Sequence, residues 1–223
     1  MLQFNTKLRT QELLVWILIT INTLPLFTAA NTIGDSVVSQ SSGLNTSIDI
    51  NDKPSAFRYP RGNGTGVELP DIKEVLQIGK GKMVSNGKHV AILNFGARMN
   101  ECKKASEILK KKGITISIFD ARFAKPLDEN LIWQLATTHE AIMTIEEGSI
   151  GGFGSHVTKL LSDRGFFDSG LKFRSMTLPD KFLDQDTPDS MYKTAGLDCN
   201  SIVQKVENVL NSNVVIAKNK NLS

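Results

Sequence analysis

Short apolar runs alternate with segments of helical periodicity through the second half of the chain. The run VAILNF, residues 90–95, is almost continuously apolar and is closed by Gly96, which is typical of a strand buried on both faces. Further strands are predicted over residues 115–119, 141–145 and 171–178. Because a helical pattern follows most of these strands after a few residues, the sequence predicts an α/β fold with a mostly parallel sheet and helices on both faces.

Four helices are predicted between and after these strands, over residues 100–112, 128–135, 154–162 and 201–210. Asn100 is a residue type that caps helix N-termini, and Asp128 begins the second of these helices. Gly113 stands just past the first helix, where a left-handed C-terminal residue is expected.

The first 30 residues have the pattern of a signal- or transit-like leader. Lys7 and Arg9 precede an apolar run over residues 13–27, and small residues follow. The run falls short of the ~20 apolar residues that a spanning helix needs, and Thr and Asn interrupt it, so we expect no stable membrane span. The leader favours organelle targeting or secretion as one alternative.

Four further segments complete the predicted organisation. Residues 31–52 are rich in Ser, Thr, Asn and Gly and predict a polar linker. Residues 53–71 carry prolines and glycines that favour an extended, irregular segment. The folded domain is expected over residues 72–210, with a polar tail over 211–223.

Composition narrows the classes of function. The chain has 223 residues, of which 40% are hydrophobic, and its net charge of +3 is too small for a nucleic-acid partner without a basic stripe, which the sequence lacks. Cys102 and Cys199 allow at most one disulfide bridge and lack metal-ligand spacing. His89, His139 and His156 fall in different predicted elements, so no metal site is predicted.

Two segments carry candidate chemistry. In FRYPRG, Arg58 and Arg61 flank a stiff Tyr-Pro pair, and a guanidinium on such a loop suits bidentate binding of phosphate; surface pairing with carboxylates is the alternative. After the predicted strand 141–145, a glycine-rich helix start forms a candidate anion or ligand loop: Gly151, Gly152, Gly154, Ser155 and His156. The preceding carboxylates, Glu146 and Glu147, fit acid–base chemistry less well than a structural role.

Three motifs, in order and spacing, point to a known family. FRYPRGNGTGVELP, DARFAKPLD and HEAIMTIEEGSIGGFGSHV, followed by LPDKFLDQDTP and AGL, closely resemble 1-deoxy-D-xylulose-5-phosphate synthase. The resemblance covers about residues 48–210, the end of that family's pyrimidine-binding domain and its transketolase C-terminal domain. It implies condensation of pyruvate with glyceraldehyde 3-phosphate for isoprenoid, thiamine and pyridoxal synthesis, in the cytoplasm or the plastid stroma. It also implies that Arg61 contacts the acceptor phosphate, with Arg58 a weaker candidate.

The chain departs from the family in its catalytic machinery. The Gly-Asp-Gly segment that holds magnesium and thiamine diphosphate is absent, as are the glutamate and histidines of the family's active centre. No catalytic residue is therefore assigned, and no cofactor is expected to bind this chain alone. The resemblance implies a partner chain with the upstream thiamine-diphosphate-binding domains, or a homodimer. A non-catalytic binding or dimerisation module and a truncated relic are the alternatives.

Overall fold

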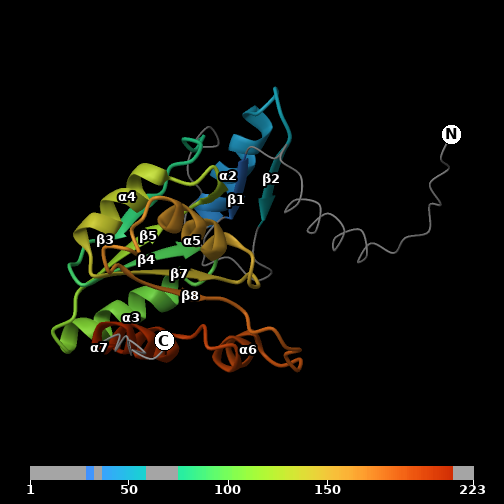
Figure 1. Ribbon diagram of the computed structural model, residues 1–223. Coiled ribbons are helices and arrows are strands. Elements are labelled where there is room, and N and C mark those ends of the chain that lie inside the picture. The colour runs from blue at the N-terminus through green and yellow to red at the C-terminus, as the bar shows by residue number, and fades with distance from the viewer. Residues whose placement is uncertain (1–28, 33–36, 59–74, 213–223) are drawn as a thin grey trace, which may run out of the picture.

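A computed structural model describes residues 29–32, 37–58 and 75–212. Its centre is a five-stranded sheet in the order β3-β5-β4-β7-β8 (Figure 1). The strands are β3 (Lys82–Ser85), β4 (Val90–Phe95), β5 (Ile116–Asp120), β7 (Ala141–Glu146) and β8 (Lys172–Met176). All neighbours are parallel except the edge strand β3, which runs antiparallel to β5. This confirms the predicted fold class.

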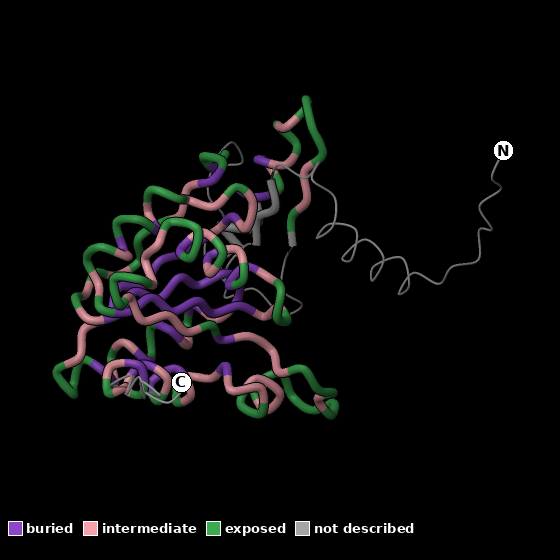
Figure 2. The backbone as a smooth tube through the Cα atoms, in the orientation of Figure 1, coloured by how far each residue is buried: buried purple, intermediate pink, exposed green. Residues whose placement is uncertain are grey.

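Helices cover both faces of this sheet because its three central strands alternate apolar side chains between two clusters. Val90 and Ile92 pack with α3 (Met99–Lys111) and α7 (Cys199–Asn211) on one face. Leu93 and Phe95 pack with α4 (Glu129–Thr138) and α5 (Phe153–Asp163) on the other. Every residue of β4, β5 and β7 is buried, which explains their continuous apolar runs (Figure 2).

Several details differ from the sequence predictions. Asp128, the predicted first residue of its helix, is the N-cap of α4. Asn100 is not a cap, since α3 begins at Met99 with Arg98 in the cap position and no side-chain cap bond. The short elements β3, β6 (Phe123–Lys125) and α6 (Pro188–Thr194) were not predicted. Gly113 has the expected left-handed backbone, with φ of 79°.

A second, three-stranded sheet has the order β2-β1-β6. It contains β1 (Ala29–Thr32) and β2 (Ser55–Arg58), which are parallel, and β6, which is antiparallel to β1. The last two residues of the predicted leader thus belong to a strand, and its first 28 residues lie outside the described residues. Within the predicted extended segment 53–71, β2 is extended, and residues 59–71 are not described. The tail was predicted from residue 211, but Asn211 is the last residue of α7, so the tail begins one residue later. Residues 213–223 are not described.

The predicted polar linker over residues 31–52 is wrong, because most of it forms α2 (Val37–Asp49). Small polar side chains stabilise this helix by bonding to backbone groups. The Thr46 hydroxyl donates to the Ser42 carbonyl at 2.6 Å and accepts from the Leu76 N–H at 2.8 Å. Composition alone predicted a disordered linker. Ser42 and Thr46 are instead buried, and the Leu76 backbone that bonds to Thr46 lies 30 residues further along the chain.

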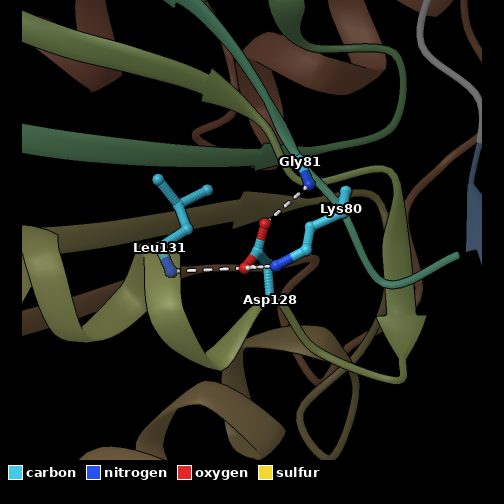
Figure 3. A network of polar contacts seen from close by, with 4 residues as sticks. All are labelled: Lys80, Gly81, Asp128 and Leu131. Carbon is cyan, nitrogen blue, oxygen red and sulfur yellow. Dashed lines mark hydrogen bonds and ion pairs between the residues drawn. The ribbon is translucent and has the colours of Figure 1, made fainter. Parts of the chain in front are cut away.

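The Asp128 carboxylate fixes the connection between β6 and α4 (Figure 3). It accepts from the Leu131 N–H at 3.3 Å, which caps α4, and from the Gly81 N–H at 3.2 Å and the Lys80 ammonium at 3.1 Å. One side chain therefore joins the start of α4 to the residues that lead into β3.

Among the described helices, none combines the length and the apolar character needed to cross a bilayer.

Candidate functional site

Two of the motifs that carry the resemblance reach the carboxyl edge of the central sheet. The DARFAKPLD segment starts at Asp120, the last residue of β5, and the EEGSIGGFG segment starts at Glu146, the last residue of β7. The small sheet brings Phe57 and Arg58, the described start of FRYPRG, close to the segment that follows β5, because β1 pairs Thr32 with Arg58 on one side and Asn31 with Phe123 on the other. In open α/β sheets this edge is where ligands bind.

The side chain of Glu146 binds the backbone at the end of the glycine-rich loop. Its carboxylate is 2% exposed and accepts hydrogen bonds from the N–H groups of Phe153 at 3.0 Å and Gly154 at 2.8 Å. A Cβ atom at Gly148 or Gly152 would lie 2.6 or 2.4 Å from its Oε2 atom. These glycines are needed because the loop backbone packs directly against the buried carboxylate.

In the candidate anion loop, the N–H groups at the start of α5 already bind a negatively charged group of the protein, the carboxylate of Glu146. Beyond the two donors that Glu146 uses, the Gly151 N–H donates to the Ser155 hydroxyl at 3.0 Å, and the Gly152 N–H donates to the Ser149 carbonyl at 3.2 Å. An external anion would have to replace these partners. Burial, with a smaller effect of Lys125, holds the pKa of His156 below its usual value. A ligand role for the five loop residues stays a prediction.

Glu147 has a different partner from Glu146, in agreement with the structural alternative for this pair. Its carboxylate lies 3.1 Å from Nε of Arg98, and both side chains are mostly buried. The Arg98 guanidinium stacks on the Tyr192 ring, with its Cζ atom 3.4 Å from the ring centroid. This cluster joins the ends of β4 and β7 to α6. Sequence reasoning missed it because Tyr192 is far from both partners along the chain.

Asp120 and Arg122 form a second buried charged group at this edge. Arg122 has a left-handed backbone, with φ of 57°, and its N–H donates to Oδ1 of Asp120 at 3.3 Å. Its Nε atom lies 3.8 Å from Oδ2 of the same carboxylate. Burial raises the pKa of Asp120, and the nearby Arg122 charge opposes that rise. A non-glycine residue with positive φ is uncommon and costly, so this backbone is held by its surroundings.

The two predicted phosphate-binding residues lie at the border of the described structure. Arg58 is the last residue of β2, so the backbone there is placed at the carboxyl edge. Arg61 lies outside the described residues. Their binding of a substrate phosphate stays a prediction.

The histidines do not gather at this edge. His139 bonds to Ser117 and His89 bonds to Thr115, both near the start of β5, whereas His156 is on α5. Among residues 29–32, 37–58 and 75–212, no three His, Cys, Asp or Glu side chains are grouped so that they could hold a metal ion. The Gly-Asp-Gly segment is also missing from the sequence. The described residues therefore offer no ligand set for a magnesium–diphosphate site, and the absence of cofactor binding by this chain alone stays a prediction.

Comparison with known proteins agrees with this geometry. A solved structure of a split gene transketolase, an inactive beta4 tetramer, matches with a TM-score of 0.73 and 24% sequence identity. The match covers 85% of this chain and 59% of that one, so the present chain spans less than two thirds of the neighbour's length. At this identity the likeness establishes the fold. The family model of the transketolase C-terminal domain matches residues 79–202, more than half of the sequence. The chain belongs to the transketolase C-terminal domain family.

Proposed function

We propose that this chain is the C-terminal part of a thiamine-diphosphate-dependent 1-deoxy-D-xylulose-5-phosphate synthase and acts only with a chain that carries the cofactor-binding domains. The reaction joins pyruvate to glyceraldehyde 3-phosphate with loss of carbon dioxide and supplies isoprenoid, thiamine and pyridoxal synthesis. We place it in the cytoplasm or plastid stroma, as in the family. Membership of the transketolase C-terminal domain family supports the enzyme class.

The observation that carries the proposal is where the described residues of three separated motifs lie. Asp120 ends β5 and Glu146 ends β7, and both strands run parallel to β4. Phe57 and Arg58 end β2, which β1 joins to β6, the strand that follows β5.

Arg61 is proposed to hold the phosphate of the acceptor aldehyde. A guanidinium presents two parallel N–H donors to phosphate oxygens, which fixes orientation as well as position. Holding the aldehyde in place lowers the entropic cost of forming the carbon–carbon bond. Arg58 is a weaker candidate for the same role, since it ends β2, three residues before Arg61.

Binding of thiamine diphosphate and magnesium is assigned to the partner chain. The related split gene transketolase supports a division of this enzyme class between two chains, because its name records a split gene and an inactive assembly of one chain type. The present chain spans 59% of that chain's length. We propose that the cofactor-binding domains of an active complex belong to that partner chain.

Co-purification tests this division. The tagged chain, isolated from cells that produce it naturally, should retain a second chain that contains a Gly-Asp-Gly segment followed by Asn. A preparation without such a chain that nevertheless converts pyruvate and glyceraldehyde 3-phosphate would contradict the proposal. Isolation with no such chain, and no activity on adding one, would favour the second candidate.

The second candidate is a non-catalytic dimerisation or binding module. One observation favours it: the related solved structure is an inactive tetramer of a single chain type. A module of this kind would associate with copies of itself and need no acceptor phosphate. Substitution of Arg61 would then leave every measured property of the chain unchanged, apart from small effects on stability.

A further inference from the structure

The segment that leads into β3 is bonded at both of its ends to other parts of the fold. At its start, the Leu76 N–H donates to the Thr46 hydroxyl on α2 at 2.8 Å, and Leu76 itself is buried. At its end, the Lys80 ammonium and the Gly81 N–H donate to the Asp128 carboxylate at 3.1 and 3.2 Å (Figure 3). The segment therefore links α2 to the turn that precedes α4.

These two anchors belong to one closed series of contacts. The turn that ends at Asp128 follows β6, and β6 pairs with β1, which pairs with β2. On β2, the Ser55 hydroxyl donates to the Ser47 carbonyl of α2 at 3.2 Å, and Thr46 is the preceding residue of that helix. The contacts thus run from Asp128 through β6, β1, β2 and α2 and return through the segment before β3. Together they form a closed ring, the contact ring.

The ion pair between Lys80 and Asp128 closes the contact ring on the central domain. The Asp128 side chain is 11% exposed and that of Lys80 is 40% exposed, so water and salt screen this pair less than a fully exposed one. Next to it, the backbone of Gly79 is left-handed, with φ of 71°, and a Cβ atom there would lie 2.8 Å from Cγ of Pro126. The segment and the turn are therefore in direct contact beside the ion pair.

The contact ring includes the backbone from which the arginine segment continues. Arg58 is the last residue of β2 and pairs in register with Thr32 of β1, and Arg61 follows three residues later in the sequence. On its other side, β1 pairs Asn31 with Phe123, which stands three residues after the end of β5. The ring therefore sets the position of the Arg58 backbone relative to the end of β5.

We propose that Lys80 and Asp128 are positioning residues for the phosphate of the acceptor substrate. Their ion pair closes the contact ring and so holds the Arg58 backbone in place, and Thr46 closes the ring at its opposite side. The pair acts through the arginine segment and is assigned no contact with substrate. The inference rests on the proposed function, because it names the residues that orient the proposed phosphate site.

Hydrogen exchange of the full chain tests the contact ring without any need for activity. Lys80→Met removes the ammonium and leaves Asp128 able to cap α4 and to accept from Gly81. The amides of β2 should exchange about threefold to tenfold faster, whereas residues 129–138 should exchange as in wild type. Asp128→Asn keeps a capping oxygen and loses the charge, so it should have the same effect. Faster exchange in α4 alone, or unchanged exchange in β2, would show only a capping role and overturn the proposal.

Lys112→Met is the matched control for the loss of a lysine ion pair. Lys112 pairs with Glu207 at 2.6 Å, and this pair also joins residues that are distant in the sequence, at the end of α3 and on α7. The control should leave the exchange of β2 unchanged. Equal acceleration of β2 by both lysine variants would show a general loss of stability and overturn the proposal.

A second substitution tests whether the contacts form one ring. Thr46→Val opens the opposite side, because valine keeps the branched shape and lacks the hydroxyl. In the double variant of Thr46→Val with Lys80→Met, β2 should exchange no faster than in the faster single variant, since the ring is already open. Ser55→Ala opens the same side at a partly buried bond and takes its place if Thr46→Val does not fold. Effects that multiply would show two independent anchors and overturn the ring.

Steady-state kinetics of the two-chain complex tests the link to substrate. Lys80→Met should raise the KM for glyceraldehyde 3-phosphate about threefold to tenfold, because a displaced guanidinium binds phosphate less well, and leave kcat and the KM for pyruvate nearly unchanged. Lys80→Arg should restore most of the loss, and Lys112→Met should equal wild type.

The kinetic outcomes separate this inference from the proposed function. An active complex in which Lys80→Met leaves the acceptor constant unchanged would overturn the positioning role and leave the proposed function intact. Inactivity of every complex, with faster exchange of β2 in Lys80→Met, would contradict the proposed function and with it the role in substrate positioning, while the contact ring would stand.

Discussion

The backbone N–H of Gly154 donates a 2.8 Å hydrogen bond to the carboxylate of Glu146, eight residues earlier in the chain. With the second bond from the Phe153 N–H, a buried carboxylate from the end of β7 caps the start of α5. The negative charge also faces the positive end of the helix dipole. The glycine-rich loop between these residues is therefore shaped by an internal anion.

Replacing that anion by a neutral group of the same shape should destabilise the domain. Glu146→Gln removes the charge and turns one amide donor toward a backbone donor, which we expect to cost about 1–3 kcal/mol in the free energy of unfolding. Urea denaturation measures this cost. Glu140→Gln is the control, since Glu140 makes an exposed ion pair with Lys172 and should change the free energy by less than about 1 kcal/mol. Equal losses in the two variants would contradict the capping role.

Packing of the loop against Glu146 predicts an ordering of two glycine substitutions. Gly152→Ala places a Cβ atom 2.4 Å from Oε2 of Glu146, so it should cost about 2–3 kcal/mol through overpacking. Gly113→Ala meets no atom within 4 Å, and its cost of about 1 kcal/mol comes from its left-handed backbone. Chemical denaturation should show the larger loss at Gly152, and the opposite order would contradict the described packing.

Two half-buried histidines, His139 and His156, predict that stability falls in mild acid. Nε2 of His139 lies 2.8 Å from the Ser117 hydroxyl, and burial holds the pKa of His139 below its usual 6.5. As pH falls through 6.5 the unfolded chain takes up a proton before the folded chain does, so the free energy of unfolding decreases down to the folded-state pKa.

His139→Gln should therefore flatten the dependence of stability on pH between about 7.5 and 5.5. The slope should fall only in part, because the pKa of His156 is lowered in the same direction. The double variant with His156→Gln should flatten it further. Urea unfolding at several pH values provides the comparison, and unchanged slopes in both variants would show that these groups do not control acid stability.

The isolated chain should not bind thiamine diphosphate. It lacks the Gly-Asp-Gly segment, and three potential metal ligands are not grouped anywhere in the described residues. Calorimetric titration with cofactor and magnesium should give no saturable heat at micromolar concentrations. Saturable binding with a dissociation constant in that range would mean that residues of another kind hold the diphosphate.

Sequence reasoning succeeded where local pattern and tertiary role agree. The apolar run of β4 predicts a strand buried on both faces, and the Asp128 side chain caps α4 where the helical pattern begins. It failed where the deciding partner is remote. Thr46 is buried in a helix because Leu76 bonds to it, 30 residues away, and α5 is capped by Glu146 from the preceding strand. Composition and periodicity contain no signal for either contact.

Arg61 carries the specific prediction for substrate binding. In a complex with the upstream domains, Arg61→Ala should raise the KM for glyceraldehyde 3-phosphate about tenfold to a hundredfold, which corresponds to ~1.5–3 kcal/mol for a charge-assisted contact. The KM for pyruvate should stay nearly constant. Arg61→Lys should recover part of the loss, because an ammonium keeps the charge without the two parallel donors. An unchanged acceptor constant in Arg61→Ala would exclude the phosphate role.

Reconstitution of the two-chain enzyme tests the central claim most directly. Carbon dioxide released from pyruvate is measured with this chain alone, with a chain carrying the Gly-Asp-Gly domains alone, and with both together in the presence of thiamine diphosphate and magnesium. We predict release that requires both chains and glyceraldehyde 3-phosphate. Release by either chain alone at the rate of the mixture, or none from the mixture although the two chains associate, would contradict the claim.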